Sequence, residues 1–124
     1  LEVYKGIDDF MVVLEDEASV ANNEPDFNLI KAMNSRGLII TAKGEAVDFV
    51  SRWYGPQTGI NEDPATGSAH ALLATYWSKI LNKSEMSARQ LSKRVGYLKC
   101  EVKDDLVEIT GEAKLYLKGT LQLD

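Results

Sequence analysis

The residues best suited to chemistry lie together in residues 59–70, which read Gly-Ile-Asn-Glu-Asp-Pro-Ala-Thr-Gly-Ser-Ala-His. These polar groups stand directly before the most apolar stretch of helical spacing in the chain. The first turn of a helix leaves backbone N–H groups unpaired and carries partial positive charge. Gly67, Ser68 and Ala69 are therefore expected to offer donors to an anion such as a substrate carboxylate. Asp63, held by Pro64, then projects toward the same helix end.

Each side chain of this segment has a role that fits such a site. Gly67 lets a ligand approach the backbone closely, and the hydroxyl of Thr66 or Ser68 caps the helix or adds a hydrogen bond. The residues alone fit a structural alternative equally well, in which Asp63 or Thr66 accepts from the helix amides and nothing binds.

His70 is the only histidine of the chain and stands two residues after Ser68. Residues i and i+2 point to different faces of a helix, which argues against a Ser-His-Asp hydrolase. One histidine beside Asp63 and Glu62 lacks the ligand set of a metal site, so no metal is expected. We therefore interpret His70 as a buried core residue, or as a residue that supports those in contact with a ligand.

The flanking sequence predicts the elements that position this segment. A central buried helix is predicted from apolar residues at helical spacing, which are Ala69, Leu72, Leu73, Tyr76, Trp77, Ile80 and Leu81. A shorter helix is predicted to start at residues 23–26 and to end at Gly37. Strands are predicted at residues 10–14, 38–42, 46–54, 97–103, 106–110 and 112–118, with residues 46–54 alternating like a half-buried strand. The sum is an α+β fold whose mostly antiparallel sheet wraps around one central buried helix.

Composition narrows the class of protein. The 124 residues are 44% hydrophobic and 27% charged, which fits one domain spanning 1–124 with an ordinary core. The net charge of -5 argues against nucleic acid as a partner, and no apolar run is long enough to span a membrane. The single cysteine, Cys100, allows no intrachain disulfide, and no export signal is visible, so we expect a cytoplasmic protein.

The segment Glu-Asp-Pro-Ala-Thr-Gly-Ser-Ala-His at residues 62–70 resembles the signature of the PhzF-like family of phenazine-biosynthesis proteins. The likeness extends upstream to Arg52 and to the Gly-Ile pair at 59–60, and downstream to Tyr-Trp at 76–77. Residues 90–96 are similar to the family's Gln-x-Ser-x-Arg-Gly-Gly segment through Gln90, Ser92 and Arg94. Val95 stands in place of the first glycine of that pair.

This resemblance implies the fold of diaminopimelate epimerase and proline racemase, with two similar lobes and the site between them. It makes this chain the C-terminal lobe, and it places the principal proton shuttle, a Glu, and an assisting His in an N-terminal lobe outside the chain. It implies a cofactor-independent isomerase that moves a proton on a small carboxylate-bearing metabolite, inactive without its other lobe. By this likeness Asp63 is catalytic, Thr66, Gly67 and Ser68 bind substrate, and the further candidates are His70, Gln90 and Arg94.

The expected partners are the carboxylate substrate and the N-terminal lobe, and a homodimer is common among similar proteins. No nucleic acid, membrane, metal or cofactor is expected. The alternative function is a non-catalytic domain of the same fold that binds a small anion or serves assembly. Proton exchange between substrate and solvent distinguishes the two, because only an isomerase catalyses it.

Overall fold

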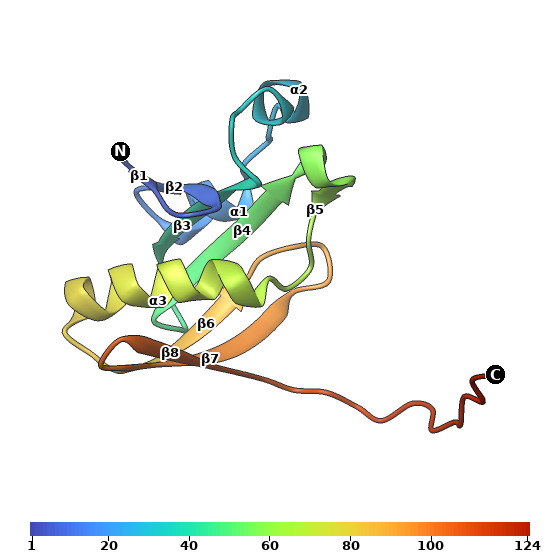
Figure 1. Ribbon diagram of the computed structural model, residues 1–124. Coiled ribbons are helices and arrows are strands. Elements are labelled where there is room, and N and C mark those ends of the chain that lie inside the picture. Colours follow the sequence, from blue (N-terminus) through green and yellow to red (C-terminus); the bar gives the residue numbers. More distant parts are fainter.

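The computed structural model describes residues 1–124 as one sheet with three α-helices (Figure 1). The elements in chain order are β1 (Glu2–Lys5), β2 (Asp9–Val13), α1 (Glu17–Ala21), α2 (Phe27–Lys31), β3 (Gly37–Lys43), β4 (Phe49–Gly55), the 3-10 turn η1 (Pro56–Thr58), β5 (Ile60–Glu62), α3 (Gly67–Leu81), β6 (Glu85–Gln90), β7 (Gly96–Lys103) and β8 (Leu106–Gly111).

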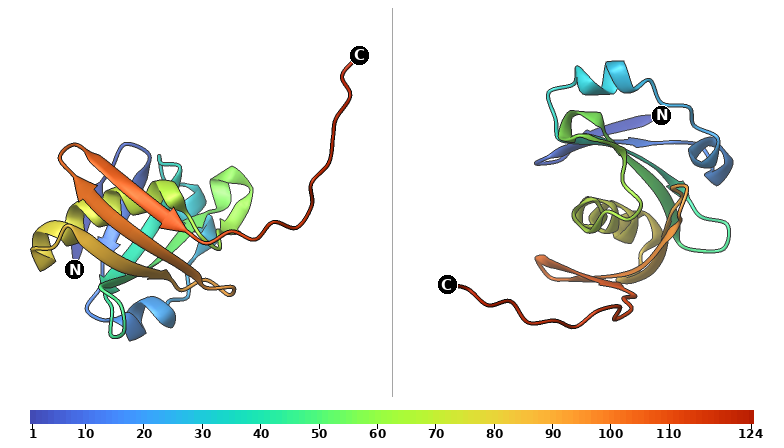
Figure 2. Two further views of the ribbon diagram at one scale, coloured as in Figure 1. Left: turned by 90° about the horizontal axis from the view of Figure 1, so that it is seen from below. Right: turned by 90° about the vertical axis from the view of Figure 1, so that its right-hand side faces the viewer.

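The strands follow the order β1-β2-β3-β4-β6-β7-β8, and β5 pairs with β4 beside that path. Five of the seven pairings are antiparallel, and β2–β3 and β4–β6 are parallel. The sheet curves around α3, which lies in its concave side (Figure 2). The predicted α+β fold, with a mostly antiparallel sheet around one central helix, is therefore confirmed.

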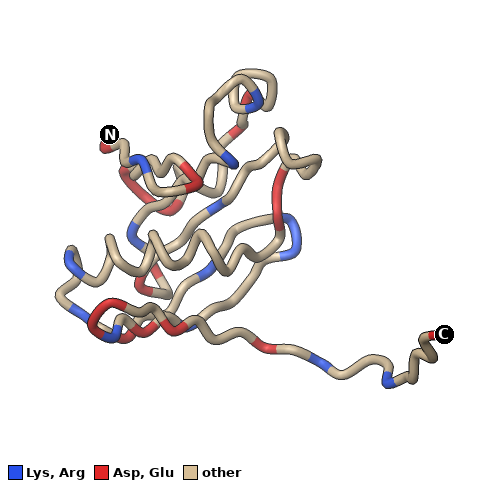
Figure 3. The backbone as a smooth tube through the Cα atoms, in the orientation of Figure 1, with Lys and Arg blue, Asp and Glu red and all other residues tan.

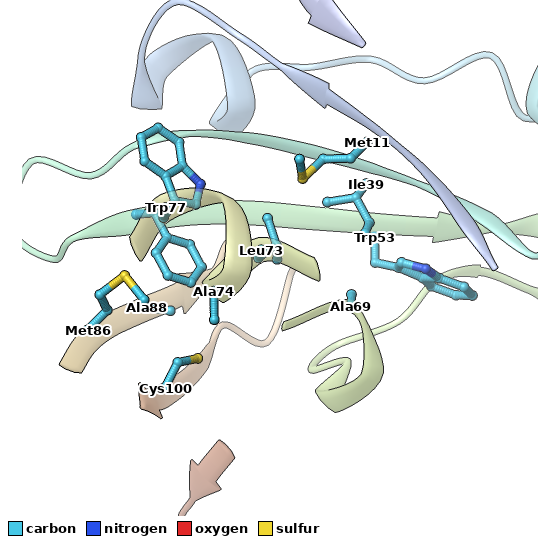
Figure 4. Packing of buried hydrophobic residues seen from close by; sticks show 11 residues of the cluster. Met11, Ile39, Trp53, Ala69, Leu73, Ala74, Trp77, Met86, Ala88 and Cys100 are labelled. Atoms are coloured by element: carbon cyan, nitrogen blue, oxygen red, sulfur yellow. The ribbon is translucent and has the colours of Figure 1, made fainter. Parts of the chain in front are cut away.

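The main core fills the space between α3 and the concave face of the sheet (Figure 4). Phe49 of β4 stacks on Trp77 of α3, with their rings 5° from parallel and their centroids 6.1 Å apart. The Trp77 indole N–H donates to the buried Thr41 hydroxyl at 2.9 Å, so the polar edge of this large ring is also satisfied. Trp77 is thus a packing residue, as helical spacing predicts.

A second core lies on the opposite face of β3 and β4, beneath α1 and α2. Each of these short helices is capped by an aspartate: Asp16 accepts from the amide of Ser19, and Asp26 accepts from two amides of α2. Their apolar residues cover Val50 and Tyr54. Strand β4 is therefore buried on both faces, whereas alternation predicts a half-buried strand, because the two helices shield its second face.

The strand predicted at residues 112–118 is wrong. After Gly111 the chain forms no helix or strand and runs away from the sheet (Figure 1). Its apolar side chains are exposed, with Leu115 at 85% and Tyr116 at 98%. The last β7–β8 pair joins Leu98 to Gly111, so no neighbouring strand lies alongside the residues that follow. Alternation alone does not form a strand without a backbone partner.

Gly37 has a different role from the predicted helix end. Helix α2 ends at Lys31, and Gly37 opens β3 with its backbone pressed against the Trp53 side chain. A Cβ atom at this position would lie 2.6 Å from both a Trp53 ring atom and the Tyr54 carbonyl oxygen. The glycine is required by this close approach, which lets the β4 tryptophan pack under the start of β3.

Charged residues of both signs are interspersed along the chain (Figure 3). The longest helix, α3, has 15 residues, and no helix is both long and apolar enough to cross a membrane.

Candidate functional site

The start of α3 has three backbone amides without a partner in the protein. Thr66 occupies the N-cap position with an extended backbone, and no side chain caps the helix. The amides of Gly67, Ser68 and Ala69 donate to no acceptor in the protein. Gly67 is exposed, and a Cβ atom built there would meet nothing within 4 Å. The prediction that Asp63 or Thr66 caps these amides, on which the structural alternative depends, is therefore wrong.

Asp63 faces this helix start. Its backbone N–H donates to the Trp53 carbonyl at 3.2 Å, which ties the residue to the end of β4. Its carboxylate oxygen Oδ2 accepts from the Thr66 hydroxyl at 2.6 Å, and Oδ1 has no partner in the protein. The half-buried carboxylate is thus fixed by one oxygen and keeps the other for a ligand.

Gln90 of β6 supports both residues from the interior and is fully buried. Its Nε2 donates to the Asp63 carbonyl at 2.7 Å and to the Thr66 hydroxyl at 3.0 Å, and its Oε1 accepts from the Thr66 amide at 2.8 Å. Because the Thr66 hydroxyl accepts from Gln90, its own proton points to Asp63. Gln90 therefore lies behind the site as its scaffold and does not reach the opening.

His70 lies in the core, with no exposed surface. Its Nδ1 is 2.7 Å from the Thr66 carbonyl oxygen, and its ring centroid lies 6.0 Å from that of Phe49. A carbonyl only accepts, so Nδ1 carries the proton and Nε2, which has no partner, is left with its lone pair. Burial lowers the pKa of His70, which favours this neutral form. The residue anchors the helix start and has no path to an external ligand.

The turn between β6 and β7 packs on the other side of the motif. The Ser92 hydroxyl donates to the Pro64 carbonyl at 2.9 Å, and a Cβ atom on Gly96 would lie only 2.8 Å from that of Ala65. Val95 adopts φ 52°, the left-handed conformation that glycine favours. The turn thus has the backbone expected of a glycine pair although its first position holds a valine.

Arg94, a sequence candidate, is exposed on this turn and makes no hydrogen bond or ion pair within the protein. With Lys93 it lines an open hollow of about 490 Å³ beside the motif, together with Glu62, Pro64 and Ser92. It lies at the rim of the site, apart from the Asp63 carboxylate network.

Sequence reasoning missed Arg36 and Asp9. Arg36 Nε donates to Asp9 Oδ1 at 3.0 Å, Nη2 pairs with Asp9 Oδ2, and Nη1 donates to the Ser68 hydroxyl oxygen at 2.8 Å. The hydrogen bond to Asp9 raises the pKa of Arg36. The pair forms because parallel pairing sets Asp9 opposite Gly37. No short-range motif in the sequence signals this contact.

Arg52 and Glu62, the two outer members of the motif region, form a structural pair. Arg52 Nε and Nη2 donate to the two Glu62 carboxylate oxygens at 2.7 and 3.0 Å. Its Nη1 reaches the carbonyls of Val20, Ala21 and Asn23 at the end of α1. The Arg52 guanidinium and the Glu62 carboxylate therefore both have partners within the protein, and Arg52 has no nitrogen left to bind an anion.

No group of three or more His, Cys, Asp or Glu side chains is placed to hold a metal ion. Cys100 is 2% exposed, and burial raises the pKa of its thiol to about 11. Its thiolate is therefore disfavoured, and the thiol packs as a small apolar group in the main core.

Residues 2–119 match the family model described as phenazine biosynthesis-like protein, PhzC-PhzF. An uncharacterized isomerase of Pseudomonas aeruginosa is 49% identical over 116 residues, which cover 94% of this chain and 45% of that protein. Among solved structures, a PhzC/PhzF phenazine-biosynthesis protein from Clostridium difficile is 44% identical with a TM-score of 0.86, over 98% of this chain and 47% of the other. A PhzF-family protein from Enterococcus faecalis is 47% identical with a TM-score of 0.79, over 91% and 46%.

The chain spans about half the length of the curated relatives it matches, 45% of the Pseudomonas aeruginosa protein. Its sheet and its central helix therefore correspond to a part of each of these longer relatives.

Proposed function

This chain belongs to the phenazine biosynthesis-like protein family, and from that premise we propose that it is the C-terminal lobe of a cofactor-independent isomerase. The substrate class is a small metabolite with a carboxylate and an activated C–H bond. Relatives of this chain carry the name isomerase, which supports the reaction class. The whole enzyme would hold its substrate between this lobe and an N-terminal one.

One observation carries the proposal: three unpaired amides at an open helix start lie beside a carboxylate that the protein fixes through one oxygen only. Helix-start amides suit a carboxylate or a developing oxyanion because they supply donors and partial positive charge. The free oxygen of Asp63 suits proton transfer to or from carbon. The amides and the free Asp63 oxygen could therefore act in one reaction, the amides on the substrate anion and the carboxylate on the proton.

The proposed reaction breaks a C–H bond and forms another on the same molecule. A carboxylate removes the proton, and the electron pair of the broken bond delocalises toward the substrate carboxylate. The amides of Gly67, Ser68 and Ala69 stabilise that charge. The proton then returns to a different carbon or to the opposite face. Asp63 is one partner of this transfer, and the resemblance supplies a Glu of the N-terminal lobe as the other.

The experiment is deuterium wash-in with the two-lobe protein. The protein is incubated in D2O with a panel of α-amino acids and unsaturated carboxylic acids, and label is followed by NMR and mass spectrometry. An isomerase is expected to place deuterium on carbon in at least one compound. A domain that only binds anions would shift amide resonances of residues 67–69 and leave every compound unlabelled, which would reject the enzymatic proposal in favour of the binding alternative.

A further inference from the structure

Arg36 reaches the start of α3 from the opening of β3, and its position is fixed before any ligand arrives. Its Nε and Nη2 engage both carboxylate oxygens of Asp9, which is 4% exposed. Its Cζ lies 5.4 Å from the centroid of the Trp53 ring, and its backbone N–H donates to the Asp8 carbonyl at 2.7 Å. The remaining nitrogen, Nη1, points to Ser68.

The direction of the Arg36–Ser68 bond follows from chemistry. A guanidinium carries only donors, so the Ser68 hydroxyl oxygen must accept at 2.8 Å. The Ser68 hydroxyl proton is then left to another acceptor, and the protein provides none. Ser68 and Arg36 both line an open hollow of about 430 Å³, whose other lining residues are Gly6, Ile7, Asp8, Asp9, Ala71 and Leu72.

We propose that Arg36 is a positioning residue that makes the Ser68 hydroxyl a donor toward the substrate carboxylate. That the ligand is a substrate carboxylate rests on the proposed function. Asp9 completes the arrangement because it neutralises Arg36 and occupies two of its nitrogens. An anion at the helix start then meets an oriented hydroxyl, while two of the guanidinium nitrogens stay bound to Asp9.

The test is a double-mutant cycle in the two-lobe protein, with kcat and KM measured by deuterium wash-in. Arg36→Lys keeps the positive charge but loses the planar guanidinium with its several N–H donors. A single ammonium group cannot reach both Asp9 oxygens and Ser68 at once. We expect Ser68→Ala to raise KM about tenfold and Arg36→Lys about fivefold, with kcat changed less than about twofold. Because the two residues act through one bond, the double variant should raise KM no more than Ser68→Ala alone.

A second variant guards against unfolding. Arg36→Gln combined with Asp9→Asn removes both charges together and leaves no buried carboxylate unpaired. It is expected to raise KM like Arg36→Lys and to melt close to the unmodified protein. Effects that multiply in the double variant, or Arg36 variants with an unchanged KM beside an impaired Ser68→Ala, would overturn the role of Arg36 and leave the isomerase proposal standing.

If the two-lobe protein places no deuterium on carbon, the isomerase proposal fails, and the same cycle is run on acetate affinity. Acetate is titrated into the two-lobe protein, and amide shifts of Gly67, Ser68 and Ala69 are followed by NMR. Loss of affinity that is shared between Arg36→Lys and Ser68→Ala supports the positioning role. Independent losses, or no acetate-dependent shift in the unmodified protein, overturn it.

Discussion

The side chain of Gln90 bonds to Thr66 twice, accepting from its amide at 2.8 Å and donating to its hydroxyl at 3.0 Å. These two bonds fix the N-cap residue of α3 to a strand 24 positions away in the sequence. They also determine which way the Thr66 hydroxyl proton points, and so they orient the Asp63 carboxylate. The order of the site thus depends on a residue that is fully buried behind it.

Gln90→Leu should destabilise the protein and loosen Asp63. The change leaves the Thr66 amide and the Asp63 carbonyl unpaired in the interior, which we expect to lower the free energy of unfolding by about 2–4 kcal/mol. Urea denaturation measures this. Gln57→Leu is the matched control, because Gln57 makes a single side-chain hydrogen bond, to the Ser35 carbonyl, away from the motif. Equal losses for both variants would contradict the scaffold role of Gln90.

Asp63→Asn should abolish most turnover and leave the fold intact. The amide keeps the shape and still accepts from the Thr66 hydroxyl, but it is no proton acceptor. Wash-in by the two-lobe protein is expected to slow by about a hundredfold or more, with little change in melting temperature. Asp26→Asn is the control, since asparagine caps a helix as well as aspartate does. A turnover loss below about threefold for Asp63→Asn would remove Asp63 from the reaction.

Gly67→Ala should separate stability from binding. The methyl group meets no protein atom within 4 Å, and alanine favours a helix, so the free energy of unfolding should stay level or rise by up to about 1 kcal/mol. The same methyl occupies the space a ligand needs near the amides, so KM should rise about tenfold. Gly111→Ala, also without a neighbour within 4 Å, is the control and should leave KM unchanged. An unchanged KM for Gly67→Ala would mean that the ligand lies elsewhere.

His70 should make stability depend on pH below neutrality. Burial lowers its pKa in the folded state below the 6.5 of a free histidine. Below pH 6.5 the unfolded chain therefore binds a proton that the folded chain does not, and stability present above 6.5 is lost as pH falls toward the lowered value. The loss should approach about 1.4 kcal/mol per pH unit.

Urea denaturation between about pH 7.5 and pH 5.5 measures this dependence. His70→Gln removes the group that titrates and retains a donor for the Thr66 carbonyl, so its stability should change less over the same range. Because His70 is the only histidine, no other imidazole contributes to the difference. Parallel curves for the two proteins would contradict the assignment.

Val95→Asn should stabilise the turn between β6 and β7. The left-handed backbone at φ 52° is costly for a β-branched side chain, and asparagine tolerates it better. The free energy of unfolding is expected to rise by about 1 kcal/mol. Val95→Ala, which keeps a Cβ atom but removes the branch, should gain less. A loss of stability in Val95→Asn would show that packing of the valine outweighs backbone strain.

The periodicity of the sequence predicts α3 and most strands of the core because those elements alternate or repeat around a single apolar face. Strand β6 is not predicted, although its Met86 and Ala88 belong to the main core. Leu73 and Trp77 are read correctly as buried for that reason. The covering of β4 by α1 and α2 is not predicted. Helix α1, with five residues, is not expected from the sequence, and the helix predicted to start at residues 23–26 carries no signal of the sheet face on which it lies. The strand predicted after Gly111 is wrong because a strand needs a neighbouring strand to pair with, and the alternation of residues does not show whether one is present.

In the candidate site, too, contacts between residues close in sequence are predictable and contacts between distant residues are not. The contact of Thr66 with Asp63 spans three residues, so the motif indicates it directly. The contacts of Gln90 and Arg36 with the motif span 24 and 32 residues and depend on which strands are neighbours. Sequence alone names Gln90 only through family resemblance, and it does not name Arg36 at all.

The irregular pairing of β4 with β5 at Tyr54 and Gly55 has a chemical consequence. Two adjacent acids follow it, and the alternation of an extended chain sends Glu62 to Arg52 and Asp63 to the helix start. Tyr54 pairs with Glu62 and Gly55 with Ile60, so β5 has one residue more than β4 between these two pairs, and deleting that residue is expected to exchange the two directions. The extra residue of β5 thus contributes to which acid pairs with Arg52 and which one faces the start of α3.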